Sequence, residues 1–505
     1  MTKRHLLLGL VLLALLGLLL VIGRSASTPG TAAPAPVTPP PASSAPAAGA
    51  APAPAKLQSL AELDDKAPPR RKLDIQRWTT AEGARVLFVE ARELPMFDLR
   101  LTFAAGSSQD GDSPGLATLT NAMLNEGIDG QDTTAIAAGF ESLGASFSNG
   151  AYRDMALASL RSLSAAEQRE PAVALFAKVV GAPTFPEAAL ARVKNQLLAG
   201  FELQKQNPGK LASIALFHQL YGQHPYARPS DGTAQSVPAI SRAQLAAFHA
   251  RAYAAGNAVI ALVGDLSRSQ AEAIATQVSA GLPKGPALPV PPAPQAPAAA
   301  TQHIEFPSQQ THLMLAQLGI DRRDPDYAAL YVGNQILGGG GFGTRLMEEV
   351  REKRGLTYGI YSTFTPMQVA GPFMINVQTR AELSEATLGL VRSLVRDFVA
   401  QGPTEQELAQ VKRELAGSFP LSTASNAEIV GQLGAIGFYD LPSTQLEDFM
   451  NQVQQLSVAQ VRDAVARHLN PDAFVVVSSG PTVAQQPLPP PVARPAALPA
   501  GTPEH

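Results

Sequence analysis

The side chains able to do chemistry are few, and their spacing excludes most kinds of active site. The chain has no cysteine, so it can form no disulfide, no thiolate nucleophile and no cysteine-ligated metal site. Its eight histidines are never three, four or five residues apart, the spacings that bring two imidazoles together on one helix face. The G-x-S-x-G nucleophile motif and the G-K-[ST] phosphate loop are also absent from the sequence.

A glycine run, GGGGFGTRL at 338–346, is one of two remaining candidates. It contains a literal G-x-G-x-x-G at Gly338, Gly340 and Gly343. A dinucleotide loop would follow a strand of a βαβ unit, whereas a helical pattern precedes this run. The pattern therefore indicates a turn between helices whose backbone is open to close approach.

The second candidate is VREKRGLTYGIYS, in which Arg351 and Tyr358 are seven residues apart. An arginine is always protonated and a tyrosine carries one hydroxyl donor. The helix-to-strand turn expected at RGLT would let both point into one cavity. The alternative is structural: Arg351 pairs with Glu348 on its own helix, and Tyr358 packs in the core.

A third stretch, SPGLATLTNAMLNEG at 113–127, has the pattern of a helix without the residues of an active site. Ser113 is a good cap, Pro114 suits the first turn and Gly127 suits the end. The helix carries Thr118, Thr120, Asn121 and Ala122, with no charged side chain before Glu126.

The chain repeats itself, which indicates an internal duplication. FPEAALARVKNQLLAGF (185–201) pairs with GPTEQELAQVKRELAGSF (402–419), and two further blocks recur in the same order at a similar offset. Each half reads as alternating strands, a helix, a strand pair, long helices and a last apolar strand. The expected fold class is α+β, with two homologous domains, each a mostly antiparallel or mixed sheet with helices packed on one face.

Composition divides the 505-residue chain into six segments. A basic start and an 18-residue apolar run predict an export signal or an uncleaved membrane anchor, with the rest of the chain outside the cytoplasm, in the periplasm. The net charge of −3 gives no sign of a nucleic-acid partner. The expected segments are a signal or anchor at 1–23, an Ala/Pro-rich linker at 24–68, domains at 69–282 and 302–481, a Pro-rich linker at 283–301 and a disordered tail at 482–505.

Three stretches of the chain together resemble the insulinase, or pitrilysin, family of zinc peptidases. They are ELPMFDLRLTFAAGSSQDGDSPGLATLTNAMLNEG, HPYARPSDGTAQSVPAIS and GGGFGTRLMEEVREKRGLTYGIYS. The likeness covers about 70–480 and is strongest to the branch with the bacterial and mitochondrial processing peptidases. Active members carry H-x-x-E-H on the helix at 113–127, where two histidines hold zinc and the glutamate activates water.

The resemblance also shows what is missing. The two histidines fall at Thr118 and Ala122, the glutamate at Asn121 and the third ligand near Gly200. None of these residues can bind zinc or act as a base, so the resemblance implies a scaffold that has lost its metal.

The resemblance gives the two remaining candidates expected roles. An arginine and a tyrosine at this spacing hold the substrate backbone and stabilise the oxyanion, which assigns Arg351 and Tyr358 as catalytic. Non-catalytic subunits carry a substrate-contacting glycine loop here, which assigns Gly339, Gly340, Gly341 and Phe342 to substrate binding.

Two functions remain open. The chain is either the metal-free subunit of a heterodimeric zinc endopeptidase, with zinc in a homologous partner and extended peptides as substrates, or an inert binding or scaffold protein that retains the fold. A membrane is a further partner if the N-terminal segment is not removed.

Overall fold

The N-terminal domain is built on a six-stranded sheet whose central strands are apolar throughout. The computed structural model describes residues 72–492. The strand order is β1-β2-β8-β3-β7-β6, with β2 and β8 parallel and the other neighbours antiparallel. The strands are β1 (Gln76–Thr79), β2 (Arg85–Glu90), β3 (Met96–Phe103), β6 (Ser146–Ala151), β7 (Ala156–Leu163) and β8 (Ala258–Gly264), with a short separate pair, β4 (Gly127–Ile128) and β5 (Gln131–Asp132).

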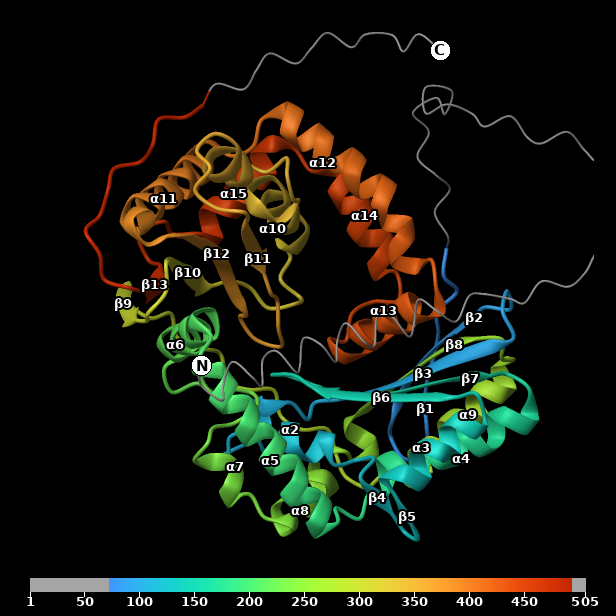
Figure 1. Cartoon of the computed structure of the whole chain (residues 1–505). Coiled ribbons are helices and arrows are strands. Elements are labelled where there is room, and N and C mark those ends of the chain that lie inside the picture. The colour runs from blue at the N-terminus through green and yellow to red at the C-terminus, as the bar shows by residue number, and fades with distance from the viewer. Residues whose placement is uncertain (1–71, 493–505) are drawn as a thin grey trace, which may run out of the picture. The chain divides into compact units, whose positions relative to one another are not determined.

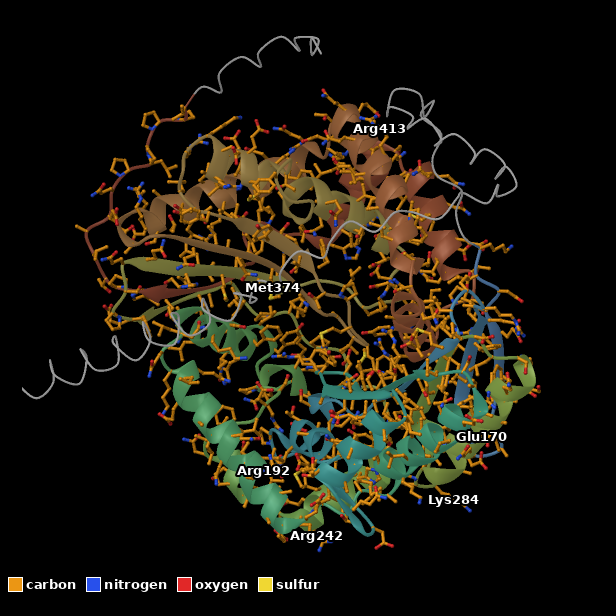
Figure 2. All side chains as sticks on the ribbon, turned by 45° about the vertical axis from the view of Figure 1, so that its right-hand side comes forward. Glu170, Arg192, Arg242, Lys284, Met374 and Arg413 are labelled. Carbon is orange, nitrogen blue, oxygen red and sulfur yellow. The ribbon has the colours of Figure 1, made fainter. Side chains whose placement is uncertain are left out.

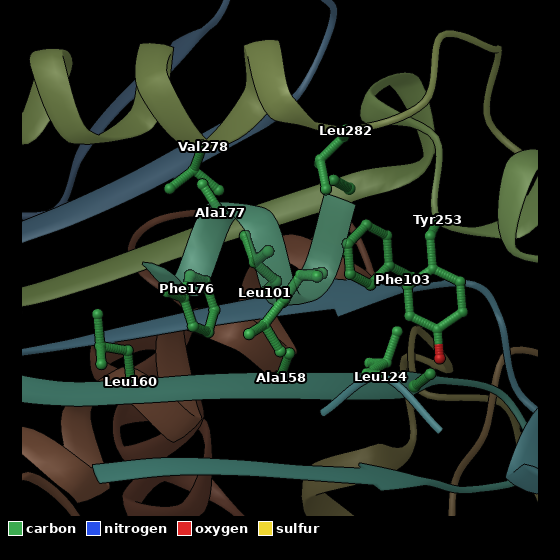
Figure 3. Packing of buried hydrophobic residues seen from close by; sticks show 14 of the residues in the cluster. Leu101, Phe103, Leu124, Ala158, Leu160, Phe176, Ala177, Tyr253, Val278 and Leu282 are labelled. Atoms are coloured by element: carbon green, nitrogen blue, oxygen red, sulfur yellow. The ribbon is translucent and has the colours of Figure 1, made fainter. Parts of the chain in front are cut away.

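Helices of the same domain cover one face of this sheet. Phe176 of α4 and Val278 of α9 pack on Leu101 and Leu160 of the sheet, in the core shown in Figure 3. The helices are α2 (Leu116–Ala122), α3 (Thr133–Ser142), α4 (Ala166–Gly181), α5 (Glu187–Gln204), α6 (Pro208–Tyr221), α7 (Ser236–Ala239), α8 (Arg242–Ala252) and α9 (Arg268–Gly281), with single turns at η2 (Ser107–Gln109), η3 (Pro225–Ala227) and η4 (Ala255–Asn257).

The C-terminal domain repeats this plan with five strands in the order β11-β12-β10-β13-β9. Only β9 and β13 are parallel. The strands are β9 (Ala300–Glu305), β10 (Gln310–Leu318), β11 (Ile360–Phe364), β12 (Pro372–Arg380) and β13 (Val475–Gly480). Its helices are α10 (Tyr327–Asn334), η5 (Gln335–Gly339), η6 (Met347–Glu352), η7 (Ala381–Leu383), α11 (Ser384–Gln401), α12 (Glu405–Ser418), η8 (Phe419–Thr423), α13 (Asn426–Phe438), α14 (Gln445–Gln455) and α15 (Val458–His468).

The second face of each sheet is covered by a helix from the other domain. Helix α13 lies against β2, β3 and β8 of the N-terminal sheet, and α6 lies against β10 and β13 of the C-terminal sheet (Figure 1). Leu433 of α13 joins Leu87 and Val259 in one apolar cluster, while Leu216 of α6 joins Val477 in another. Every residue of β8 is therefore buried, as its continuous apolar sequence requires.

The expected fold class is confirmed in its main features: two related domains, each with a mixed sheet and packed helices. The expectation that helices occupy one face of each sheet was incomplete. The sequence pattern identified apolar strands but did not say which helix covers their second face.

The helix expected over 113–127 is shorter and is capped differently. It spans Leu116–Ala122, and its N-cap is Gly115, which has a φ of +94°. Ser113 provides no cap. Instead both carboxylate oxygens of Asp110 accept backbone N–H groups, those of Gly115 and Ala117, each at 2.7 Å. The cap therefore comes from outside the helical pattern.

The part of the expected disordered tail that the structure describes, residues 482–492, is held against the C-terminal domain. The Gln485 side chain donates to the Ala381 carbonyl, and the backbone N–H of Val492 donates to the Lys353 carbonyl at 2.7 Å. The Pro-rich linker at 283–301 is likewise extended but anchored, because Leu288 N–H donates to Asn257 Oδ1.

The signal or anchor segment at 1–23 and the linker at 24–68 lie outside the described residues. Within 72–492, none of the helices combines the length and the hydropathy needed to span a bilayer.

A substitution at Gly437 tests whether α13 of the C-terminal domain packs closely on the sheet of the N-terminal domain. A Cβ at this position of α13 would lie 2.4 Å from Val259 Cγ1 and 2.7 Å from Leu87 Cδ1. We expect Gly437→Ala to lower the free energy of unfolding by about 1–2 kcal/mol, because overpacking outweighs the gain of about 1 kcal/mol in helix propensity. The measurement is chemical denaturation.

Gly417 of α12 is the matched control, since a Cβ there has no neighbour within 4 Å. Gly417→Ala should leave stability unchanged or raise it by up to about 1 kcal/mol. Equal effects of the two substitutions would contradict the close packing of α13 on β2 and β8.

Candidate functional site

The three motif positions on α2 have structural partners instead of a metal. Thr118 Oγ1 donates to the Ser230 carbonyl at 2.8 Å. Asn121 is 2% exposed, and its Nδ2 donates to the Leu157 carbonyl and to Tyr253 Oη, both at 3.1 Å. Ala122 packs against the core. The helix that resembles the zinc helix is therefore tied to the scaffold through its polar residues.

Tyr253, directly after α8, extends this polar link into the core. Burial raises its pKa, so the hydroxyl stays neutral and can accept the hydrogen bond from Asn121. Its ring stacks on His249 with centroids 5.0 Å apart, and His249 Nε2 donates to the Val180 carbonyl at 2.7 Å. Burial lowers the pKa of His249, and within the described residues this imidazole belongs to no compact group of metal-ligating side chains.

Asp110, which caps α2, is buried, and burial raises its pKa to about 7 despite the two N–H donors. Its two oxygens both accept from the cap, and within the described residues Asp110 belongs to no compact group of metal-ligating side chains. Sequence reasoning missed this residue, because its only signal is an aspartate five residues before Gly115.

The residues present do not fit the family's zinc ion. At Gly200 on α5 a Cβ would have no neighbour within 4 Å, so there is space for a side chain but no ligand. In the part of the chain that the structure describes, Asp324, Asp326 and His468 form the one carboxylate–imidazole group compact enough for a metal. Arg467 already pairs with Asp326 at 2.8 Å, and none of these residues is on α2.

Arg351 lies on η6 with its guanidinium against an aromatic ring. The Cζ atom is 4.6 Å from the centroid of the Phe342 ring, and Nη1 is 3.5 Å from Glu352 Oε1. The ion pair expected with Glu348 on the same helix is not formed, since Glu348 pairs with Lys353. A partly exposed pair at 3.5 Å leaves most guanidinium donors free for a ligand.

Tyr358 is 92% exposed, so the alternative that it packs in the core is wrong. It lies in the loop between η6 and β11, where Gly359 N–H bonds to Thr357 Oγ1. Within the described residues its hydroxyl has no hydrogen-bond partner. A large exposed side chain with a free donor is the arrangement expected of a contact residue.

The glycine loop has a steric reason for its composition. A Cβ on Gly339 would lie 2.4 Å from Asn334 Nδ2, one on Gly340 would lie 2.7 Å from the Gln335 carbonyl, and Gly341 has a φ of +87°. The next residue, Phe342, is 70% exposed. The glycines thus allow the loop to fold tightly over α10 and present one aromatic side chain beside Arg351.

The structure does not bring the two candidate regions together. Across residues 72–492, no hydrogen bond, ion pair or ring contact joins Arg351 or Tyr358 to Thr118, Asn121 or Ala122. What it does bring together is Phe342 and Arg351, a contact that the sequence placed on two separate motifs. The donors Arg351 and Tyr358 therefore make no direct contact with the degenerate helix.

Comparison with known proteins defines the class. The family model "Insulinase (Peptidase family M16)" matches residues 85–234, and "Peptidase M16 inactive domain" matches residues 239–415. A crystal structure of a peptidase M16 inactive domain from Pseudomonas fluorescens is 70% identical, with a TM-score of 0.81, and covers 83% of this chain and 100% of that one. The chain belongs to the M16, or insulinase, family, and it is an M16-like protein without the catalytic zinc motif.

Two further relatives differ in whether their names describe a peptidase. The protein named non-peptidase homolog YmxG from Helicobacter pylori is 27% identical over 398 residues, which is 78% of this chain and 91% of that protein. An uncharacterized zinc protease of Mycobacterium tuberculosis is 28% identical over 310 residues, covering 59% of this chain and 68% of that protein.

Asn121 tests whether the degenerate motif has become structural. Asn121→Asp replaces the buried donor with an oxygen that faces the Leu157 carbonyl. We expect the free energy of unfolding to fall by about 1–3 kcal/mol, the cost of an unsatisfied buried polar group. Denaturation of the purified chain is the measurement.

The matched control is Asn451→Asp, because Asn451 is exposed on α14. This substitution should alter the free energy of unfolding by no more than about 0.5 kcal/mol. If Asn121→Asp were as mild as the control, the hydrogen bonds of Asn121 would not contribute to the fold.

Proposed function

We propose that this chain is the metal-free subunit of a heterodimeric M16 zinc endopeptidase. The observation that carries the proposal is a pair of available donors. Tyr358 is 92% exposed and has no hydrogen-bond partner among the described residues, and Arg351 is partly exposed and paired only with Glu352 at 3.5 Å and with the Phe342 ring. A homologous partner would supply the zinc ion and the general base. This chain would supply the donors that polarise the substrate.

The chemistry of the donors supports this role. The carbonyl oxygen of a scissile peptide gains negative charge as the tetrahedral intermediate forms. The Arg351 guanidinium and the Tyr358 hydroxyl can both donate to that oxygen, and such donors in a site closed from water contribute about 3–4 kcal/mol each to transition-state stability. In this chain Tyr358 is open to solvent, so the gain depends on a partner that excludes water.

An extended peptide has a docking edge available on the N-terminal domain. Strand β6 is the outermost strand of its sheet and pairs only with β7. A strand with one unpaired edge can accept a peptide through backbone hydrogen bonds, which favours extended substrates over a particular sequence. Asn149 of β6 also donates to the Asn121 carbonyl, which fixes this edge beside α2.

The compartment is part of the proposal. The N-terminal apolar run and the basic residues before it favour export, so we place the globular part in the periplasm, held at the inner membrane if the run is kept.

A scaffold role is the second candidate, and two observations favour it. The guanidinium of Arg351 already has partners in Phe342 and Glu352, and a relative bears the name non-peptidase homolog. The two candidates differ in their genetic context. A neighbouring gene that encodes H-x-x-E-H and lacks the Arg–Tyr pair favours the heterodimer, whereas a fully equipped neighbour or none favours the scaffold.

The metal content of the isolated chain tests the first half of the proposal, that this chain holds no zinc and is inactive alone. The purified exported protein should bind well under one equivalent of zinc in a metal analysis and should cleave no unfolded peptide, because Thr118, Asn121 and Ala122 provide no ligands. One tightly held divalent ion per monomer together with peptide cleavage would overturn the split-site proposal.

A substitution of Tyr358 tests the second half of the proposal, that this chain supplies oxyanion donors. In the complex with the partner, Tyr358→Phe should lower turnover about 10²–10³-fold through loss of one oxyanion donor. Assembly should be unaffected, since the substitution removes only a hydroxyl. Turnover is measured with a quenched fluorescent peptide, and assembly by size-exclusion chromatography.

Tyr361→Phe is the control, because Tyr361 is also exposed but lies on β11; it should keep the rate. If the Tyr358→Phe and Arg351→Ala complexes both cut at the wild-type rate, the catalytic role of the pair is wrong even if the heterodimer exists.

A further inference from the structure

A cavity of about 240 Å³ lies where the two domains meet, away from both α2 and the Arg–Tyr pair. Its walls come from the start of β2, the Pro-rich linker, the connection between β10 and α10, and the end of α13. Its lining is Arg85, Ala104, Asn257, Ala287, Leu288, Val290, Arg322, Arg323, Met367, Gln368, Phe438, Tyr439 and Asp440.

The lining carries more positive than negative charge. Three arginines face one carboxylate, Asp440. That carboxylate is 3.9 Å from Arg85 Nη1 and its side chain is 74% exposed, so it neutralises the cavity weakly. Burial lowers the pKa of Arg85, the direction expected for a cation that lacks close compensation.

Arg322 is the least compensated of these cations. Its guanidinium has no carboxylate partner and no hydrogen-bond acceptor among the described residues, and its Nη1 is covered without a partner. It stacks on the Tyr327 ring with Cζ 4.0 Å from the centroid, which fixes its position. A buried guanidinium N–H without an acceptor, as at Arg322 Nη1, is unfavourable by itself, and a bound anion would relieve this.

One neutral donor, Tyr439, also lines the cavity. Burial raises the pKa of Tyr439, so its hydroxyl stays a donor, and no described residue bonds to it. The buried Asp154 carboxylate accepts from the Tyr226 hydroxyl and from Gln368 N–H and forms no ion pair with Arg322.

The geometry points to a binding site for a small organic oxyanion with a short apolar body. Arg322 and the exposed Arg323 supply the charge, the Tyr439 hydroxyl supplies a further donor, and the apolar body contacts Leu288, Val290 and Met367. Carboxylates and phosphates share the required chemistry, since both present two or more oxygens to guanidinium groups. The site lies outside the proposed peptidase surface and does not depend on the proposed function.

The test uses the full exported chain without a partner. Thermal unfolding is followed in sodium butyrate, in inorganic phosphate and in the neutral isostere butyramide, with chloride keeping the ionic strength equal. An anion at about twenty times its dissociation constant should raise the melting temperature by about 2 °C for a chain of this size. Butyramide should give no rise.

Arg322→Gln should abolish the anion-dependent rise, and Arg323→Gln should reduce it. Arg413→Gln is the matched control: Arg413 is an exposed arginine on α12 (Figure 2) and is not among the residues that line the cavity, so this variant should behave as wild type. Titration calorimetry of the wild type with butyrate and butyramide provides a second measurement if Arg322→Gln does not fold.

A larger effect of phosphate than of butyrate would assign a phosphorylated ligand, and the reverse order a carboxylate. The proposal is overturned if neither anion binds the wild type, if butyramide binds as well as butyrate, or if the Arg322→Gln and Arg413→Gln chains respond equally.

Discussion

The structure depends on the burial of both faces of each sheet, and this is achieved only by exchanging helices between the domains. Strand β8 is apolar at all seven positions and fully buried, so a single layer of helices could not cover it. Helix α13 crosses from the C-terminal domain to cover it, and α6 crosses the other way. Because each domain completes the core of the other, we expect neither to be a stable unit alone. Close fits such as that of Gly437 against Val259 show how tightly the exchange is packed.

That coupling explains how the zinc motif could be lost without loss of the fold. The zinc helix does not hold the domains together; β8, α13 and α6 do. On α2 the position of the family's glutamate is Asn121, which is hydrogen-bonded to Leu157 and Tyr253 of the same domain. Asp110 caps the same helix. A carboxylate at position 121 would now lie in a buried site that provides acceptors, so return to a catalytic motif would need changes beyond the motif itself.

The sequence predicted what periodicity and duplication can encode. Alternation identified strands such as β3 and β10, helical spacing identified α5 and α12, and the repeated blocks implied two related domains. It could not predict contacts between distant segments: the cap from Asp110, the support of Asn121 by Tyr253, and the cover of β8 by α13 all join residues that no local pattern links. The tail at 482–492 makes a related point, because a Pro-rich composition excludes a core of its own but not hydrogen bonds from the Gln485 side chain to the Ala381 carbonyl and from Val492 N–H to the Lys353 carbonyl.

The exposure of Tyr358 bears on why such a pair would be kept. A phenol that is open to water at 92% already has water as its partner, so it adds little to stability and nothing to catalysis. The same hydroxyl gains its full effect only where water is excluded and the effective dielectric is low. In this chain Phe342 lies over Arg351 whereas Tyr358 is left uncovered. Under the proposed function, the surface that covers Tyr358 would come from the partner subunit, and the donors would form one part of a shared site.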